Sequence, residues 1–591
     1  MLKRLNGKNV LFLRFLFLSA GTALAMTPVL AQTVGGTGGG NNGGSCADYG
    51  TGGAPSQNGQ DGSLTKFGNC GGGGGGGGGA GGAEGGAGGG VQDSDNGIGG
   101  VGGRGGTHGA IIDTDNQIYT NGGNLAGGAG EKGGNGADAN ATYYSGGGGG
   151  GGGAGGYGLV ANRASTITNS ANATIQGGEG GAGGDGGNAP ASAYPGGGGN
   201  GGDGGVGIWL NSDNIAVTNH SVIVGGKGGD AGLSGKRPDP DSGQDVYHDQ
   251  GGDPGAGGTA IYAVGTAGGQ ISNVTGASIV GGDGGVSVSQ AEALSTYANA
   301  DGGRGGDGVA GSVTIQNEGS ILGGNGSDAS EGSPFRPGGS TTPPAFIGAN
   351  GGAGGRGIAS DAGINSISNS GNVVGGNGGN GGAVKATNSA TSGNGGAGGS
   401  GIFASSGNTI TNSGTVTGGN GGDGAIVFNT DVTNGNGGNG GDGISGAGIS
   451  VINSGTVTPG TGGAAGSGQA GKDGIAIHLL SSSSGNSLEI QKGSDIHGDV
   501  VAEGGDNVFI LGGSQDESFS GTLSSTIDNA SDYQGFQTYR KSGSSTWTLA
   551  ASYNNDWQIR GGTLEVGDSG VIADTSTIDT GDASGSGPVS Y

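Results

Sequence analysis

The chain has 591 residues, of which 168 are glycine and 13 are proline, and its formal net charge at pH 7 is −26 with 20 lysines and arginines. This acidic balance, with no basic cluster larger than an adjacent pair after Arg14, argues against binding to nucleic acid or to an anionic membrane surface. So much glycine, taken alone, is typical of low-complexity or disordered chains, so a folded core has to come from how the remaining apolar residues are arranged.

The first 31 residues have the features of a secretion signal. Basic residues at the start precede an apolar run at 11–25, and small residues end at Ala31, which predicts cleavage before Gln32. A second possible site is Ala23–Ala25. Arg14 interrupts the apolar run, and no later stretch approaches about 18 apolar residues, so we expect a mature chain without a transmembrane helix.

Residues 32–108 are dominated by glycine, asparagine, serine and alanine, which predicts a loosely ordered amino-terminal region. It contains the two cysteines of the chain, Cys46 and Cys70. An exported chain meets an oxidising compartment, so we expect these cysteines to form a disulfide that closes a loop of about 25 residues and contributes about 3 kcal/mol. Two unpaired thiols are the alternative, and the spacing does not fit the short CxxC spacing of zinc sites.

One pattern recurs throughout residues 109–473 and is clearest at Gly401–Gly424. Ile402, Ile410 and Val416 lie at even separations from Asn412, with threonines at odd separations. A period of two predicts short strands with inward aliphatic side chains. One unit buries too little to fold alone, so the units must stack. The sequence therefore predicts an all-β fold, a right-handed parallel β-helix with glycine-rich loops.

An asparagine follows the second strand of each unit. Because stacked strands place equivalent residues in columns, we expect these amides to form a hydrogen-bonded ladder with a structural role. The column consists of Asn121, Asn169, Asn219, Asn273, Asn317, Asn369, Asn412 and Asn453.

The glycine-rich spacers between units contain little to bury, which predicts irregular or mobile loops. Two of them, at 302–310 and 437–445, fit the calcium-binding nonapeptide G-G-x-G-x-D-x-U-x. Asp307 and Asp442 would supply the oxygen ligands that calcium prefers. Such sites need neighbouring nonapeptides to complete the ligand shell, and here each stands alone, so chance matches are the alternative.

Residues 474–566 differ in composition, because aromatic residues and longer alternating strands make a compact core possible. We expect an aromatic-rich cap there, followed by a polar tail at 567–591. The stretch from Leu488 to Val566 resembles the end of autotransporter passengers of Gram-negative bacteria, whose pattern is K-x-G-x-G-T-W-x-L followed by G-G-T-L-x-V. The matching residues are Lys541, Gly543, Thr546, Trp547, Leu549, Gly562, Thr563, Leu564 and Val566. Ser545 replaces the second glycine.

The resemblance implies a β-helix carried through the inner membrane to the cell surface, the outer membrane or the extracellular space by type V secretion. It also implies a carboxy-terminal translocator barrel as partner. A barrel needs at least about eight strands of 9 to 11 residues, and 25 residues follow Val566, so no barrel is expected within this chain. A truncated chain, an orphan passenger and a separate translocator are the alternatives.

The resemblance and the composition together predict an adhesin-like protein that makes non-enzymatic contact with host matrix, cells or abiotic surfaces, without a cofactor. A polysaccharide-degrading enzyme on the same scaffold is the alternative, as is an inactive truncated fragment. An enzyme of that kind needs paired carboxylates on one face. Asp203, Asp230, Asp283 and Asp423 are instead spread one per spacer, which favours solubility over catalysis.

Overall fold

A computed structural model describes most of the chain after the amino-terminal segment. The described residues are 34–38, 49–63, 72–91, 94–140, 144–238, 245–247, 251–264, 269–288, 300–331, 346–361, 363, 365–384, 390–426 and 432–580. The chain divides into two compact units, Met1–Leu30 and Ala31–Tyr591. The expected cleavage site at Ala31 and Gln32 and the expected Cys46–Cys70 disulfide both lie outside the described residues.

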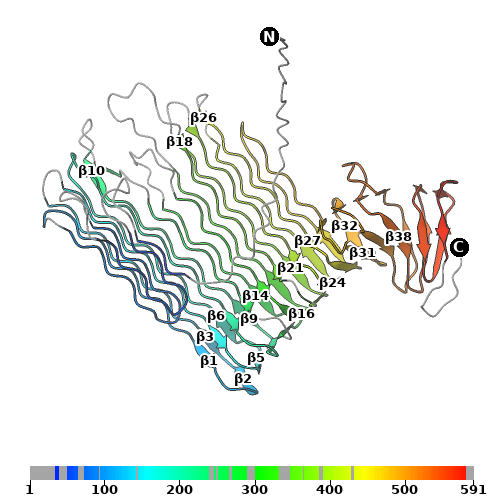
Figure 1. Ribbon diagram of the computed structural model, residues 1–591, viewed down its shortest axis with the longest axis horizontal. Coiled ribbons are helices and arrows are strands. Elements are labelled where there is room, and N and C mark those ends of the chain that lie inside the picture. The colour runs from blue at the N-terminus through cyan, green and yellow to red at the C-terminus, as the bar shows by residue number, and fades with distance from the viewer. Residues whose placement is uncertain are drawn as a thin grey trace, which may run out of the picture. The chain divides into compact units, whose positions relative to one another are not determined.

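Three long parallel sheets form the faces of a β-helix, and each repeat from residue 110 to residue 496 contributes one strand to each sheet (Figure 1). Sheet 1 contains, in spatial order, β1 (Ala110–Ile112), β4 (Leu159–Ala161), β7 (Ile208–Leu210), β12 (Ile261–Ala263), β15 (Val309–Gly311), β19 (Ile358–Ser360), β23 (Ile402–Ala404), β27 (Ile444–Ala447), β30 (Ile477–Leu480), β33 (Val500–Ala502), β37 (Tyr533–Gln534) and β36 (Leu523–Ser524). Sheet 2 contains β2 (Gln117–Asn121), β5 (Ser165–Asn169), β8 (Ala216–Asn219), β13 (Gly269–Asn273), β16 (Val313–Asn317), β20 (Ser366–Asn369), β24 (Thr409–Asn412), β28 (Ser450–Asn453), β31 (Ser487–Ile490), β34 (Val508–Leu511), β38 (Thr538–Lys541), β41 (Trp557–Ile559) and β44 (Ile578–Asp579). Sheet 3 contains β3 (Asn124–Ala126), β6 (Thr174–Gln176), β9 (Val222–Val224), β14 (Ser278–Val280), β17 (Ser320–Leu322), β21 (Asn372–Val374), β25 (Thr415–Thr417), β29 (Thr456–Thr458) and β32 (Asp495–Ile496).

Short strands complete the described residues. An antiparallel pair is formed by β10 (Lys236–Pro238) and β11 (Asp245–Tyr247), and the other short sheets are parallel. They consist of β18 (Phe346–Ile347), β22 (Ala390–Thr391) and β26 (Val432–Thr433), then β35 (Glu517–Phe519), β39 (Thr546–Leu549) and β42 (Thr563–Val566), and finally β40 (Ser552–Tyr553) with β43 (Val571–Ile572). β43 and β44 lie in the stretch expected to be a polar tail, so its described part joins the sheets.

The interior of the β-helix is built from columns of equivalent aliphatic residues. In sheet 2 the strands pair in register, so that Ile367 of one repeat lies beside Ile410 of the next, and both side chains are fully buried. Val416 takes the same role in sheet 3. No helix occurs among the described residues. The prediction of an all-β parallel β-helix is confirmed.

The asparagines occupy one column at the end of the sheet-2 strands. Asn369 Nδ2 donates to Asn412 Oδ1 at 2.9 Å and also to the Thr415 carbonyl at 3.1 Å. Equivalent amide bonds of 2.7 to 2.9 Å link every neighbour from Asn121 to Asn453. Each amide therefore joins two repeats and also holds the corner between sheets 2 and 3.

The glycine-rich spacers form two hydrogen-bonded layers, visible in Figure 1 as lines that leave the strands together. In each repeat before residue 477 an outgoing segment follows the sheet-3 strand and a returning segment precedes the next sheet-1 strand, as at 177–188 and 196–207. Gly180 N donates to the Lys227 carbonyl of the next outgoing segment at 2.8 Å, and Gly181 N donates to the Gly153 carbonyl of a returning segment at 2.7 Å.

The same pair of hydrogen bonds recurs three residues later. Gly183 N donates to the next outgoing segment, and Gly184 N donates to a returning segment. A period of three without internal hydrogen bonds is the geometry of a polyproline II helix. A Cβ on Gly181 would lie 2.0 Å from the Glu131 carbonyl oxygen, so neighbouring backbones approach too closely for any other residue. The expectation of irregular loops is wrong for these residues. Backbone hydrogen bonds, not side-chain burial, order them.

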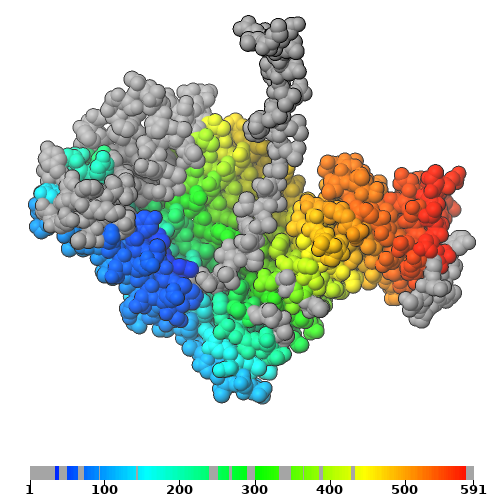
Figure 2. All heavy atoms as spheres, in the orientation of Figure 1, coloured from blue at the N-terminus to red at the C-terminus, as the bar shows by residue number. Residues whose placement is uncertain are grey.

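The described residues of the amino-terminal region add a third layer. Gly148, Gly151 and Ala154 of a returning segment donate to the carbonyls of Gly72, Gly75 and Gly78 at 2.8 to 2.9 Å. Figure 2 shows the blue amino-terminal residues on the surface beside later repeats. A loosely ordered region was expected here. The described part instead forms regular backbone hydrogen bonds. Uninterrupted glycine leaves every side of a polyproline II segment free of side chains, so neighbouring segments can pack on all sides.

The third residue of each glycine triplet points outward and forms a second kind of ladder. Asn377 N donates to Asn325 Oδ1 and Asn420 N donates to Asn377 Oδ1, both at 2.9 Å. Asp423 N donates to Asn380 Oδ1 at 2.8 Å in a neighbouring column. The aspartates and asparagines of the spacers thus satisfy the one backbone N–H per triplet that no glycine neighbour bonds.

Candidate binding site

The candidate site lies where the outer face of sheet 1 meets the returning glycine segments. The middle residues of the sheet-1 strands align in register, as Val160 beside Trp209 and Trp209 beside Tyr262. They pack outside the main core, against the last outward residues of the returning segments, including Tyr157 and Val206. This corner brings together side chains from successive repeats along the axis.

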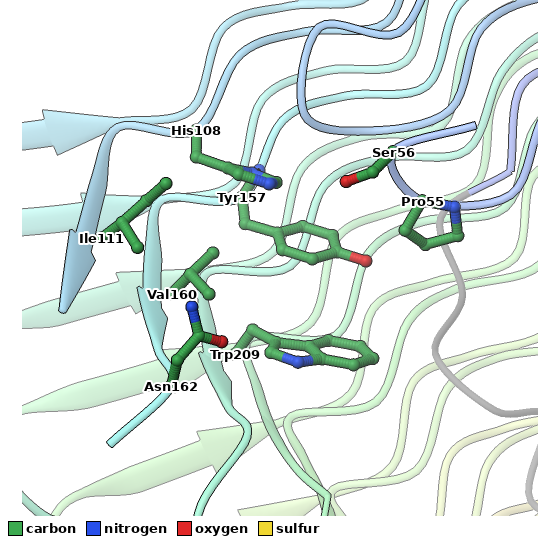
Figure 3. A pocket seen from close by; sticks show the side chains of 8 residues that line it. All are labelled: Pro55, Ser56, His108, Ile111, Tyr157, Val160, Asn162 and Trp209. Atoms are coloured by element: carbon green, nitrogen blue, oxygen red, sulfur yellow. The ribbon is translucent and has the colours of Figure 1, made fainter. Parts of the chain in front are cut away.

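Four rings stack along this corner. The ring centroids are 4.8 Å apart for His108 and Tyr157, 5.1 Å for Tyr157 and Trp209, and 4.9 Å for Trp209 and Tyr262. The Tyr157 and Trp209 planes differ by only 9°. Each ring comes from a different repeat, and the rings of His108, Tyr157 and Trp209 lie one above another along the corner (Figure 3).

A pocket of about 300 Å³ opens beside this aromatic stack. One wall is the turn at Pro55 and Ser56 from the amino-terminal layer, and the other is formed by the solenoid (Figure 3). The lining residues are Pro55, Ser56, His108, Ile111, Tyr157, Val160, Asn162 and Trp209. The pocket thus exists only because the amino-terminal layer packs beside the first repeats.

Hydrogen bonds and backbone conformation fix the polar groups of the pocket. His108 Nδ1 accepts a hydrogen bond from the Tyr157 backbone N–H at 3.1 Å, and burial lowers the pKa of His108. The imidazole is therefore neutral at pH 7 and carries its proton on Nε2. Asn162 Nδ2 donates to Asp113 Oδ1 at 2.8 Å. Ser56 has a φ of 59°, a backbone conformation that non-glycine residues rarely adopt.

Further along the same corner, Asp307 and Arg356 occupy the position that Tyr157 has in its repeat, directly before the glycine that precedes the sheet-1 strand. The Arg356 guanidinium lies 4.3 Å from the centre of the Phe403 ring, within the range of a cation–π contact. The Arg356 backbone N–H donates to Asp307 Oδ1 at 2.7 Å. Burial raises the pKa of the Asp307 carboxyl, against the opposing charges of Arg356 and Arg304.

His478 lies between two carboxylates at the end of the corner. Its Nδ1 is 3.3 Å from Asp442 Oδ2 and its Nε2 is 3.1 Å from Glu503 Oε1. Burial lowers the pKa of His478, but the hydrogen bonds and charges of Asp442 and Glu503 outweigh it, so the pKa is raised overall. A raised histidine pKa stabilises the fold below the unfolded value, and that stabilisation is lost as pH rises through the folded value.

The structure places the calcium candidates Asp307 and Asp442 in the same outward column of returning segments. Asp442 Oδ1 accepts the Ile475 backbone N–H at 2.8 Å, as Asp307 does for Arg356. Among the described residues, no group of three or more histidine, cysteine, aspartate or glutamate side chains is arranged to hold a metal ion. Calcium binding stays a prediction.

The residues of the passenger-like motif gather in the last repeats. Trp547 is 2% exposed and donates from Nε1 to the Gly512 carbonyl at 2.9 Å, while Leu549 and Leu564 lie in the same core. Gly562 has a φ of 64° and packs against Lys541, whose ammonium bonds the Ser542 and Gly561 carbonyls. These residues hold successive strands together.

No family model, curated protein or solved structure matches this chain. The fold therefore defines the class, a parallel β-helix with layered glycine segments, and the resemblance to autotransporter passengers stays a prediction. Within the described part of the chain, no helix is long and apolar enough to cross a membrane.

Sequence reasoning missed the aromatic stack and the surroundings of His478. The signal was present, because His108 and Tyr157 come directly before a glycine that opens a sheet-1 strand, and Trp209 is the middle residue of the next one. Aligning the repeats on that glycine would have placed the rings in adjacent columns.

Proposed function

We propose that this protein is exported and acts as an adhesin-like passenger, making non-enzymatic contacts with matrix, cells or abiotic surfaces. The observation that carries the proposal is the paired glycine layers. They hold outward side chains in aligned columns, such as Asn325, Asn377 and Asn420.

Such an array suits multivalent contact, because many weak interactions acting together give strong retention. The ordered backbone also lowers the conformational entropy that binding costs. The secretion signal and the passenger-like motif support an extracellular location.

The test uses beads coated with the purified exported protein, applied to fibronectin, collagen, cultured cells and polystyrene. A matched variant replaces residues 418–443, one outgoing and one returning segment, with the short connection 497–499 that joins β32 to β33. We expect the parent protein to retain beads and the shortened variant to retain fewer, while circular dichroism shows that its strands stay folded.

Equal retention by the shortened variant, or no retention by the parent, would contradict the proposal. Release of reducing sugars from common glycans by the parent protein would favour the enzymatic alternative. The shortened variant controls for the β-helix itself, because it keeps all three sheets.

A further inference from the structure

We propose that the pocket beside the aromatic stack binds one pyranose residue of a neutral glycan. The inference rests on the proposed adhesive function and names a ligand class for one site.

The lining combines apolar and polar surfaces. Pro55, Ile111, Val160 and the edge of Trp209 provide apolar walls, while Ser56, His108 and Asn162 provide hydroxyl, imidazole and amide groups. A pyranose has apolar C–H faces and a rim of hydroxyl groups, so it matches both kinds of surface. A wholly apolar ligand would offer no hydrogen bond to the Ser56 hydroxyl or to the His108 Nε2–H, which costs free energy, whereas the Asn162 amide is already bonded to Asp113 and Asn211.

The charge of the pocket selects a neutral ligand. None of its eight lining residues is a lysine, arginine, aspartate or glutamate, and His108 is neutral at pH 7 because its Nδ1 accepts the Tyr157 N–H in a buried position. A charged ligand would lose hydration without gaining an opposite charge among these residues. The fixed Nε2–H of His108 can donate to a sugar oxygen.

The pocket is preformed and small. Tyr157 is 3% exposed, and its ring is held between those of His108 and Trp209. The opposite wall is held by the Ser56 backbone N–H, which donates to the Ala80 carbonyl at 2.7 Å. A rigid site loses little entropy on binding. About 300 Å³ lies at the lower end for ligand pockets, which suits one sugar ring with the rest of the glycan outside.

The test measures binding of the full exported protein to an array of oligosaccharides ending in glucose, galactose, mannose or N-acetylglucosamine. Calorimetry with the best binder then gives an affinity. The blocking variant is Ile111→Trp, because Ile111 lines the pocket and is 52% exposed. The matched control is Ile118→Trp on β2, since Ile118 is 79% exposed and lies outside the pocket lining.

We expect Ile111→Trp to weaken binding at least tenfold and Ile118→Trp to stay within twofold of the parent, with equal unfolding midpoints. Ser56→Ala should weaken binding by a smaller factor through loss of one hydroxyl. Unchanged affinity in Ile111→Trp would overturn the proposal, as would exclusive binding of anionic glycans or of apolar peptides.

The two proposals fail separately. A parent protein that coats beads and retains them on surfaces, yet binds no neutral glycan on the array, keeps the adhesive function and loses this pocket assignment. A protein that binds the glycan but retains no beads keeps the pocket assignment and loses the adhesive function.

Discussion

The repeats that carry glycine layers and the carboxy-terminal stem, residues 477–580, achieve order in different ways. In the stem the connection from sheet 3 to sheet 1 is only 497–499, and large rings fill the interior. The Phe509 ring lies 5.0 Å from that of Tyr533 and 5.6 Å from that of Phe536. In the earlier repeats small aliphatic columns suffice, because the glycine layers add backbone hydrogen bonds around them.

The comparison shows that an ordered region does not need apolar side chains at each position. Backbone N–H and C=O groups that find partners in neighbouring segments order a chain, provided that nothing keeps the segments apart. The stem lacks these layers, and its stability depends on a few bulky residues. This difference predicts which substitutions each region tolerates.

The largest effect is expected in the stem. Trp547→Ala removes a buried ring and its bond to the Gly512 carbonyl, which should cost about 3 to 5 kcal/mol. Val416→Ala, at a fully buried site in the earlier repeats, should cost about 2 kcal/mol. Urea unfolding followed by far-ultraviolet circular dichroism measures both. Equal costs would remove the distinction between the two interiors.

The next effect belongs to the glycine layers. A Cβ on Gly150 would lie 2.0 Å from the Val101 carbonyl oxygen, so Gly150→Ala should force the layers apart at a cost of about 3 kcal/mol. A Cβ on Gly505 of the stem would have no other atom within 4 Å, so Gly505→Ala should change stability by less than about 0.5 kcal/mol. Urea unfolding compares the two variants. Similar values for both would mean that the layers are not closely packed.

A smaller loss is expected for the asparagine column. Asn369→Ala leaves Asn317 and Asn412 each without one amide partner, which should cost about 1 to 3 kcal/mol. The control Asn377→Ala removes an exposed outward amide and should cost about 0.5 kcal/mol or less. Denaturant midpoints report the difference. A neutral Asn369→Ala would show that the column contributes no net stability.

A pH dependence of the stem is expected as well. Burial lowers the pKa of Lys541 to about 8, against the charges of Glu489 and Asp516. An unfolded lysine titrates near 10.4, so between these values the unfolded state binds more protons and stability rises with pH. Lys541→Met should abolish this rise, as seen in melting temperatures from about pH 7.5 to 9, below the range in which the stem tyrosines, whose pKa values burial raises, change stability with pH. A parent protein whose stability falls in this window would contradict the assignment.

The β-helix and its asparagine column were predictable because their signal lies in side chains. Ile410, Asn412 and Val416 recur at fixed offsets, and alternation together with stacking dictates which of them point inward. The sequence did not lead us to predict that the glycine segments are ordered. We judged order by the burial of apolar side chains, and glycine has no side chain to bury. The period of three in the spacers was the available signal.

The candidate pocket was harder to predict, because its two walls are distant in the sequence. Pro55 and Ser56 meet Tyr157 and Trp209 only after the amino-terminal segments pack as a third layer. That packing is possible where glycine also occupies every third position, which in other spacers holds a larger residue, as at 146–153. Each side of a polyproline II segment that faces a neighbouring segment requires glycine. Applied to the sequence, this rule would have indicated where a third layer fits.

Hydrogen–deuterium exchange of the purified protein, resolved to peptides covering 146–156, tests the central claim most directly. Each backbone N–H from Gly148 to Gly156 donates to another segment, so these amides should exchange orders of magnitude more slowly than free glycine-rich peptide, as slowly as those of the strands. Exchange at the rate of an unstructured chain would contradict the layered structure and the binding surfaces built on it.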